Sequence, residues 1–191
     1  AESSEQAFQQ LDRLNQASVA LLDPLIDPQL ADQPALQARR LGDALTACAQ
    51  AGERAGVRGL NYLVTLAVPH LHKLAGSPAW PQAREAIEIW VGDVVAFCAG
   101  HLPPDHVGPL MSGLQGLPEF PPVPAQFITL IRRRLAQDAE VISALAAAAA
   151  QVDASRAQVI GAGAYPNPEV EFLAGRIDFI QGFFSKADTS A

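Results

Sequence analysis

Apolar residues recur at intervals of three or four along almost the whole chain, and proline and glycine interrupt this pattern at several places. Such spacing places apolar side chains on one face of an α-helix, whereas a half-buried strand would need strict alternation. Because proline and glycine favour helix ends, these interruptions divide the pattern into separate helices. The sequence therefore predicts an all-α protein, an antiparallel helical bundle of about six to seven helices.

The interruptions divide the chain into seven predicted helices, which are grouped into two predicted domains. The helices cover residues 4–22, 34–52, 57–75, 78–99, 104–116, 124–158 and 168–185. Residues 23–34 contain three prolines and predict a linker with at most one short turn. Pro69 lies inside the third helix and predicts a kink. Residues 1–160 are expected to form the bundle domain, and residues 161–191 a glycine hinge followed by an aromatic-rich helix.

The composition limits the classes of partner. Hydrophobic residues make up 49% of the 191 residues, enough for a real core. Charged residues make up only 17%, so part of the surface is expected to be apolar, which favours a protein partner or a homodimer. The net charge of −7 disfavours nucleic acid and anionic lipid. No segment has the length for membrane insertion and no signal peptide is visible, so a cytoplasmic protein is predicted.

The histidines do not form a metal-binding pattern. They are His70, His72, His101 and His106. Two helical ligands would need a spacing of three or four residues, which no pair of these histidines has on one helix. No metal and no cofactor is therefore predicted, and the histidines are interpreted as surface or capping residues.

The sequence contains no recognisable catalytic motif. A nucleophile elbow, a phosphate-binding glycine loop and a dinucleotide-binding loop are all absent. The carboxylates are predicted on solvent faces, as Glu85 and Glu88 beside Arg84 illustrate. Cys48 and Cys98 lie in apolar helical patterns and are interpreted as two buried, reduced thiols, with a disulfide between them as the alternative.

The last predicted helix is rich in phenylalanine. Its four phenylalanines are Phe172, Phe179, Phe183 and Phe184. Apolar residues occur on more than one face of this helix, so two interpretations stay open. The helix packs into a groove of the bundle, or its aromatic side chains form a docking face for a partner.

The segment His72–Ser77 resembles the phosphorylation motif of histidine phosphotransfer domains. In that motif a helix-borne histidine is followed by lysine at the third position and glycine at the fourth. His72 and Gly76 match, but Lys73 occupies the first position and Ala75 stands where the lysine is expected. A proline also follows Ser77, so the helix should end where the family's helix continues. The resemblance implies phosphotransfer through His72.

A broader resemblance covers about half of the chain, residues 36–137. It depends on the spacing of leucine, tryptophan and proline: Cys48, Gly59, Leu60, Leu63, Leu71, Leu74, Trp90, Phe97, Leu110, Leu114, Pro121–Pro124 and Phe127–Leu135. This pattern is similar to the phosphotransfer-like helical modules of hybrid histidine kinases in bacterial chemotaxis and twitching motility. Such modules often lack the phosphorylated histidine and act as scaffolds or docking modules.

Three functional hypotheses follow. The first is a non-catalytic protein-interaction module in bacterial two-component or chemosensory signalling, whose partner is a response regulator or a kinase. The second is an active phosphotransfer protein that uses His72. The third is a helical binder of a small ligand or lipid, with Trp80, Trp90 and the C-terminal phenylalanines around a cavity.

Overall fold

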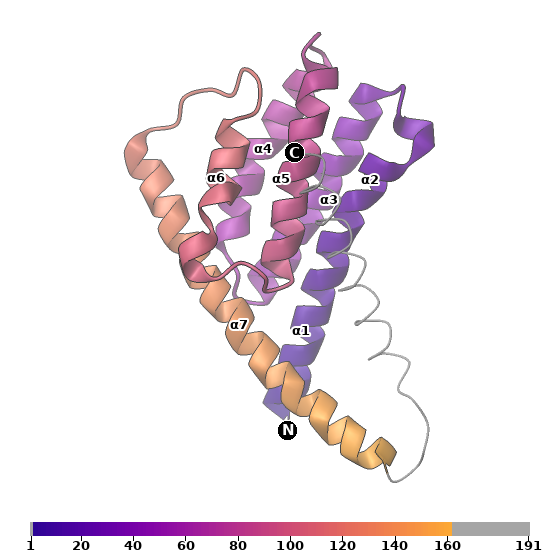
Figure 1. Cartoon of the computed structure of the whole chain (residues 1–191), viewed down its shortest axis with the longest axis vertical. Coiled ribbons are helices and arrows are strands. Elements are labelled where there is room, and N and C mark those ends of the chain that lie inside the picture. Colours follow the sequence, from indigo (N-terminus) through magenta and orange to yellow (C-terminus); the bar gives the residue numbers. More distant parts are fainter. Residues whose placement is uncertain (1, 162–191) are drawn as a thin grey trace.

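The computed structural model of the chain describes residues 2–161, all of whose regular elements are helical (Figure 1). The α-helices are α1 (Glu2–Val19), α2 (Asp23–Ile26), α3 (Pro34–Arg54), α4 (Gly59–Ala75), α5 (Trp80–Cys98), α6 (Gly108–Gln115) and α7 (Ala125–Gly161). Three single turns of 3₁₀-helix accompany them: η1 (Ala20–Leu22), η2 (Pro28–Leu30) and η3 (Pro104–His106). The prediction of an all-α helical bundle is confirmed, and the antiparallel arrangement stays a prediction.

The helices pack around one continuous apolar core. The most extensive helix pairs are α3 with α4 and α1 with α7. Figure 1 shows α7 passing diagonally along the outside of the bundle, from the side of α6 to the N-terminal end of α1. There the Arg156 guanidinium lies 3.2 Å from the Glu5 carboxylate and stacks over the Phe8 ring at 5.0 Å. This contact joins the late part of α7 to the first turns of α1.

The core is built by the apolar stripes that the spacing predicts. Its largest fully buried side chains include Trp90, Phe97, Leu14, Leu41, Leu63, Leu71 and Ile87. Each leucine or isoleucine of this size contributes about 1.5–3 kcal/mol when fully buried. Burial of these stripes, rather than helix propensity, therefore accounts for most of the stability of the bundle.

The prediction of a linker over residues 23–34 is wrong. This stretch contains α2 and η2, and Leu25 and Leu30 from it belong to the buried residues. Pro24 stands in the first turn of α2, where proline removes no hydrogen bond because the first amides of a helix have no partner. The Asp27 side chain accepts from the Gln29 amide at 2.9 Å and caps η2. The prolines here begin new turns instead of opening a loop.

Helix boundaries differ from the predicted ones by one to four residues at most ends. The N-cap predicted at Ser77 does form, because its hydroxyl accepts from the Ala79 amide at 3.1 Å, but a turn intervenes before α5 begins at Trp80. The predicted helix over 104–116 is divided into η3 and α6. Pro69 lies inside α4 as predicted. Exposed positions such as this one tolerate proline because water can satisfy the freed carbonyl.

The predicted C-terminal helix, with Phe172, Phe179, Phe183 and Phe184, lies outside the described residues. No helix in residues 2–161 combines the length and the apolar character that crossing a bilayer requires.

Candidate functional site

His72, Lys73 and Gly76 lie together at the C-terminal end of α4, and all three are exposed. The helix ends at Ala75, so it stops within the motif as the following proline predicts. Beside His72, α3 approaches closely, since a Cβ at Gly42 would lie 3.6 Å from the His72 Nε2 atom. Within the described part of the chain the His72 imidazole forms no hydrogen bond or ion pair, so its ring nitrogens are available to a partner.

His70 is buried, and its interpretation as a surface or capping residue is wrong. Its Nε2 atom lies 2.8 Å from the Pro118 carbonyl oxygen, and its ring meets Phe120 edge to face at 4.9 Å. A carbonyl can only accept, so Nε2 carries the proton in this contact. His70 therefore fastens α4 to the segment after α6, while His101 and His106 are exposed.

The two cysteines meet in the core. Both are buried, as predicted, and the Cys48 and Cys98 sulfur atoms lie 3.9 Å apart as free thiols. The hydrogen bond between the thiols and their burial raise the pKa of Cys98 well above its ordinary value. The thiol form is therefore favoured, and this pair is a poor nucleophile at neutral pH. Within residues 2–161 no group of three histidine, cysteine or acidic side chains is arranged to hold a metal ion.

Asp138 is a buried carboxylate that contradicts the predicted placement of all carboxylates on solvent faces. Only 2% of its surface is exposed. Its Oδ1 atom accepts from the Arg58 amide at 3.0 Å, and its Oδ2 atom accepts from the Gly59 amide at 2.5 Å. These are amides at the beginning of α4, whose own N-cap residue provides no side-chain hydrogen bond. Asp138 therefore caps α4 from α7, about eighty residues further along the chain.

Burial raises the pKa of Asp138 to about 6, while the two amide donors and the Arg134 guanidinium lower it. The cap also requires glycine at its centre, because a Cβ at Gly59 would clash with the Asp138 carboxylate and lie 3.1 Å from Leu135 Cδ2. The spacing of apolar residues in α7 indicates that Asp138 is buried. Asp138 falls between Leu135 and Ile142 on the apolar stripe, a register where a charged residue needs a buried partner.

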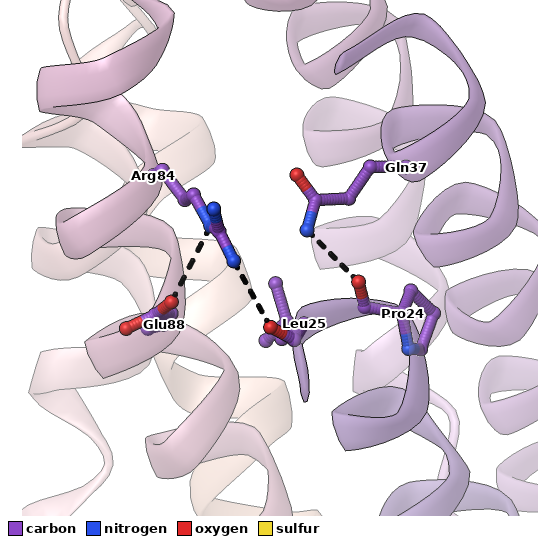
Figure 2. Close-up of polar contacts among 5 residues, drawn as sticks. All are labelled: Pro24, Leu25, Gln37, Arg84 and Glu88. Atoms are coloured by element: carbon purple, nitrogen blue, oxygen red, sulfur yellow. Dashed lines mark hydrogen bonds and ion pairs between the residues drawn. The ribbon is translucent and has the colours of Figure 1, made fainter. Parts of the chain in front are cut away.

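Two side chains hold the end of α2 between α3 and α5, and Figure 2 shows this arrangement. Gln37 of α3 donates to the Pro24 carbonyl at 2.9 Å, and Arg84 of α5 donates to the Leu25 carbonyl at 3.2 Å. Arg84 also lies 3.6 Å from the Glu88 carboxylate. Carbonyls at a helix end lack partners, and a cation there is favoured by the helix dipole. This α2 clamp explains why a four-residue helix is stable between two long ones.

The tryptophans of the ligand-binding hypothesis are buried in the core. Trp90 is 1% exposed and its Nε1 donates to the Leu110 carbonyl at 2.8 Å, and Trp80 is 6% exposed. Both belong to the apolar core, and Trp90 packs between α5 and α6.

The polar residues thus form two groups. Asp138, His70, Gln37 and Trp90 are buried, and each bonds to main-chain atoms and stabilises the fold. The side chains of His72 and Lys73 are exposed and form no such bond within the described residues. The comparisons add no relative to this description: no protein-family model, no curated protein and no solved structure matches the chain.

Proposed function

We propose that this chain is a non-catalytic helical protein-interaction module that binds a response regulator or a kinase of a bacterial two-component or chemosensory pathway. The exposure of His72, Lys73 and Gly76 together at the end of α4 is the observation that supports this best. The His72 imidazole and the Lys73 ammonium group can donate hydrogen bonds to acidic side chains of a partner. Gly76 has no side chain, so the partner surface can approach the main chain closely there. A cytoplasmic location belongs to the same proposal.

The second candidate is phosphotransfer through His72. Its support is the same exposed imidazole, whose ring nitrogen could attack the phosphorus of a phosphorylated aspartate in a receiver domain. The aspartate carboxylate would then be the leaving group. Against it stand the end of the helix at Ala75 and the position of Lys73, one residue after the histidine instead of three.

One experiment separates the two candidates. The full chain is incubated with phosphorylated receiver domains and with autophosphorylating kinases from the same genome, and both label on the chain and binding are measured. His72→Gln removes the nucleophile, and His101→Gln changes another exposed histidine as the matched control. We expect binding without label in all three proteins, with weaker binding of His72→Gln alone.

Label that is lost only in His72→Gln would establish phosphotransfer. Absence of both label and binding with every receiver domain and kinase would refute the proposed interaction.

A further inference from the structure

A cleft between η3, α6 and α7 has two exposed arginines, Arg132 and Arg133, in its lining. Its volume is about 640 Å³, and it is open to solvent. One wall is the stretch from Pro104 to Ser112, and the opposite wall is Thr129, Arg132 and Arg133 of α7. His72 lies in α4, which does not line this cleft, so the cleft is a second candidate surface.

The two arginines of the cleft have no partner within the described residues. Neither Arg132 nor Arg133 forms an ion pair or a hydrogen bond there, and both side chains are exposed. In contrast, their neighbour Arg134 lies close enough to Asp138 to lower the pKa of that carboxyl. The chain as a whole has a net charge of −7, but these two unpaired guanidinium groups make this wall of the cleft positively charged. A positive wall attracts carboxylates.

The remaining lining favours a peptide over a small anion. Pro104 and Pro109 contribute exposed apolar surface, and the Ser112 hydroxyl forms no hydrogen bond with another described residue. Asp105 also lines the cleft, with its carboxylate 3.0 Å from His106 Nδ1, and it would repel a dense anion such as a nucleic acid. An open cleft with charge, hydroxyl and proline surfaces side by side fits an extended segment with alternating acidic and apolar residues.

We propose that this cleft binds an acidic peptide segment of a partner protein. Arg132 and Arg133 pair with its carboxylates, and the two prolines contact an apolar side chain between them. Binding is electrostatic and weakens with salt, because the arginines are exposed and screened. It does not depend on His72, so it stands apart from the proposed signalling function.

The test uses a fluorescein-labelled eight-residue peptide of glutamates with two leucines and the full chain. Its affinity is measured by fluorescence anisotropy, and its position by amide shifts of the ¹⁵N-labelled chain. The double variant Arg132→Gln/Arg133→Gln should bind about tenfold more weakly, since each exposed pair contributes a few-fold. Arg39→Gln/Arg40→Gln is the matched control, because it removes two adjacent exposed arginines from α3 and should change affinity by less than about twofold.

Asp105→Asn should bind the peptide about twofold more tightly, since it removes a repelling charge. We expect amide shifts over residues 104–112 and 129–133. Equal losses in the two double variants, shifts elsewhere on the chain, or no binding at low salt would overturn the proposal. Inorganic phosphate that gives the same shifts at the same concentration would show a small-anion site, and would also overturn it. Loss of peptide binding in His72→Gln would show that the cleft and the His72 surface form one site, which would contradict the independence of the cleft.

Discussion

Replacing Asp138 by alanine tests whether the long-range cap of α4 stabilises the bundle. The substitution removes the acceptors of the Gly59 and Arg58 amides, both at the beginning of α4. A buried amide without a partner costs about 1–3 kcal/mol. The Gly59 amide is buried and bears this full cost, whereas the Arg58 amide is only partly buried, so water can replace part of its bond. The loss should therefore be about 2–4 kcal/mol.

The measurement is urea unfolding of the full chain at pH 7, followed by circular dichroism at 222 nm. Asp105→Ala is the control, because that carboxylate is exposed and, among the described residues, pairs with the exposed His106 alone. It should change the free energy of unfolding by less than about 0.5 kcal/mol. The slope of the free energy against urea should stay the same in both variants, which would show that only stability has changed.

An Asp138→Ala protein within about 0.5 kcal/mol of the wild type would refute the reasoning. It would mean that the two amides at the start of α4 find water as readily as the carboxylate. The cost of burying the charge, which raises the pKa of Asp138 to about 6, would then balance what its hydrogen bonds contribute.

Three further predictions concern the stability of the bundle. Gly59→Ala should lower the free energy of unfolding by about 3 kcal/mol, because the new Cβ clashes with the Asp138 carboxylate. Gly108→Ala is the control and should be neutral or stabilising, because the space around its Cβ is open. Urea unfolding measures both variants. Asp138 binds its proton more tightly in the folded than in the unfolded chain, so the stability that comes from this protonation is fully present below pH 3.8 and is lost as the pH rises through 6. Above pH 6 only the contribution of the two amide bonds to the carboxylate is left. The stability of the wild type relative to Asp138→Asn should therefore increase as the pH falls from 7 to 4, and a decrease over this range would show a lowered pKa instead. Trp90→Phe should cost about 2 kcal/mol through loss of the bond to the Leu110 carbonyl and of indole packing, measured by thermal unfolding.

Local signals in the sequence account for most of the fold. Apolar spacing places Leu41, Leu45 and Cys48 on one buried face of α3, and these residues are at most 1% exposed. Glycine after Ala75 and Ala99 marks the ends of α4 and α5. Such features depend on neighbours three or four residues apart, and a single sequence contains them in full.

The sequence does not identify features that depend on distant parts of the chain. Asp138 and His70 are polar residues at buried positions, and their partners lie 79 and 48 residues away. The register of the apolar stripe predicts that such residues are buried, but only the three-dimensional packing identifies the main-chain atoms that satisfy them. The same applies to α2, which depends on side chains from α3 and α5. The cleft with Arg132 and Arg133 also needed the structure, because its two walls are separate in the sequence.

The separation of buried and exposed polar residues makes the functional tests interpretable. Substitutions at Asp138 or His70 remove bonds to the main chain, so any loss of binding in those variants would be confounded by loss of structure. His72, Arg132 and Arg133 form no such bonds within the described residues, and each is exposed. Their substitution should change the free energy of unfolding by less than about 0.5 kcal/mol. A change in binding at either surface, with unchanged urea unfolding, would therefore report on recognition alone.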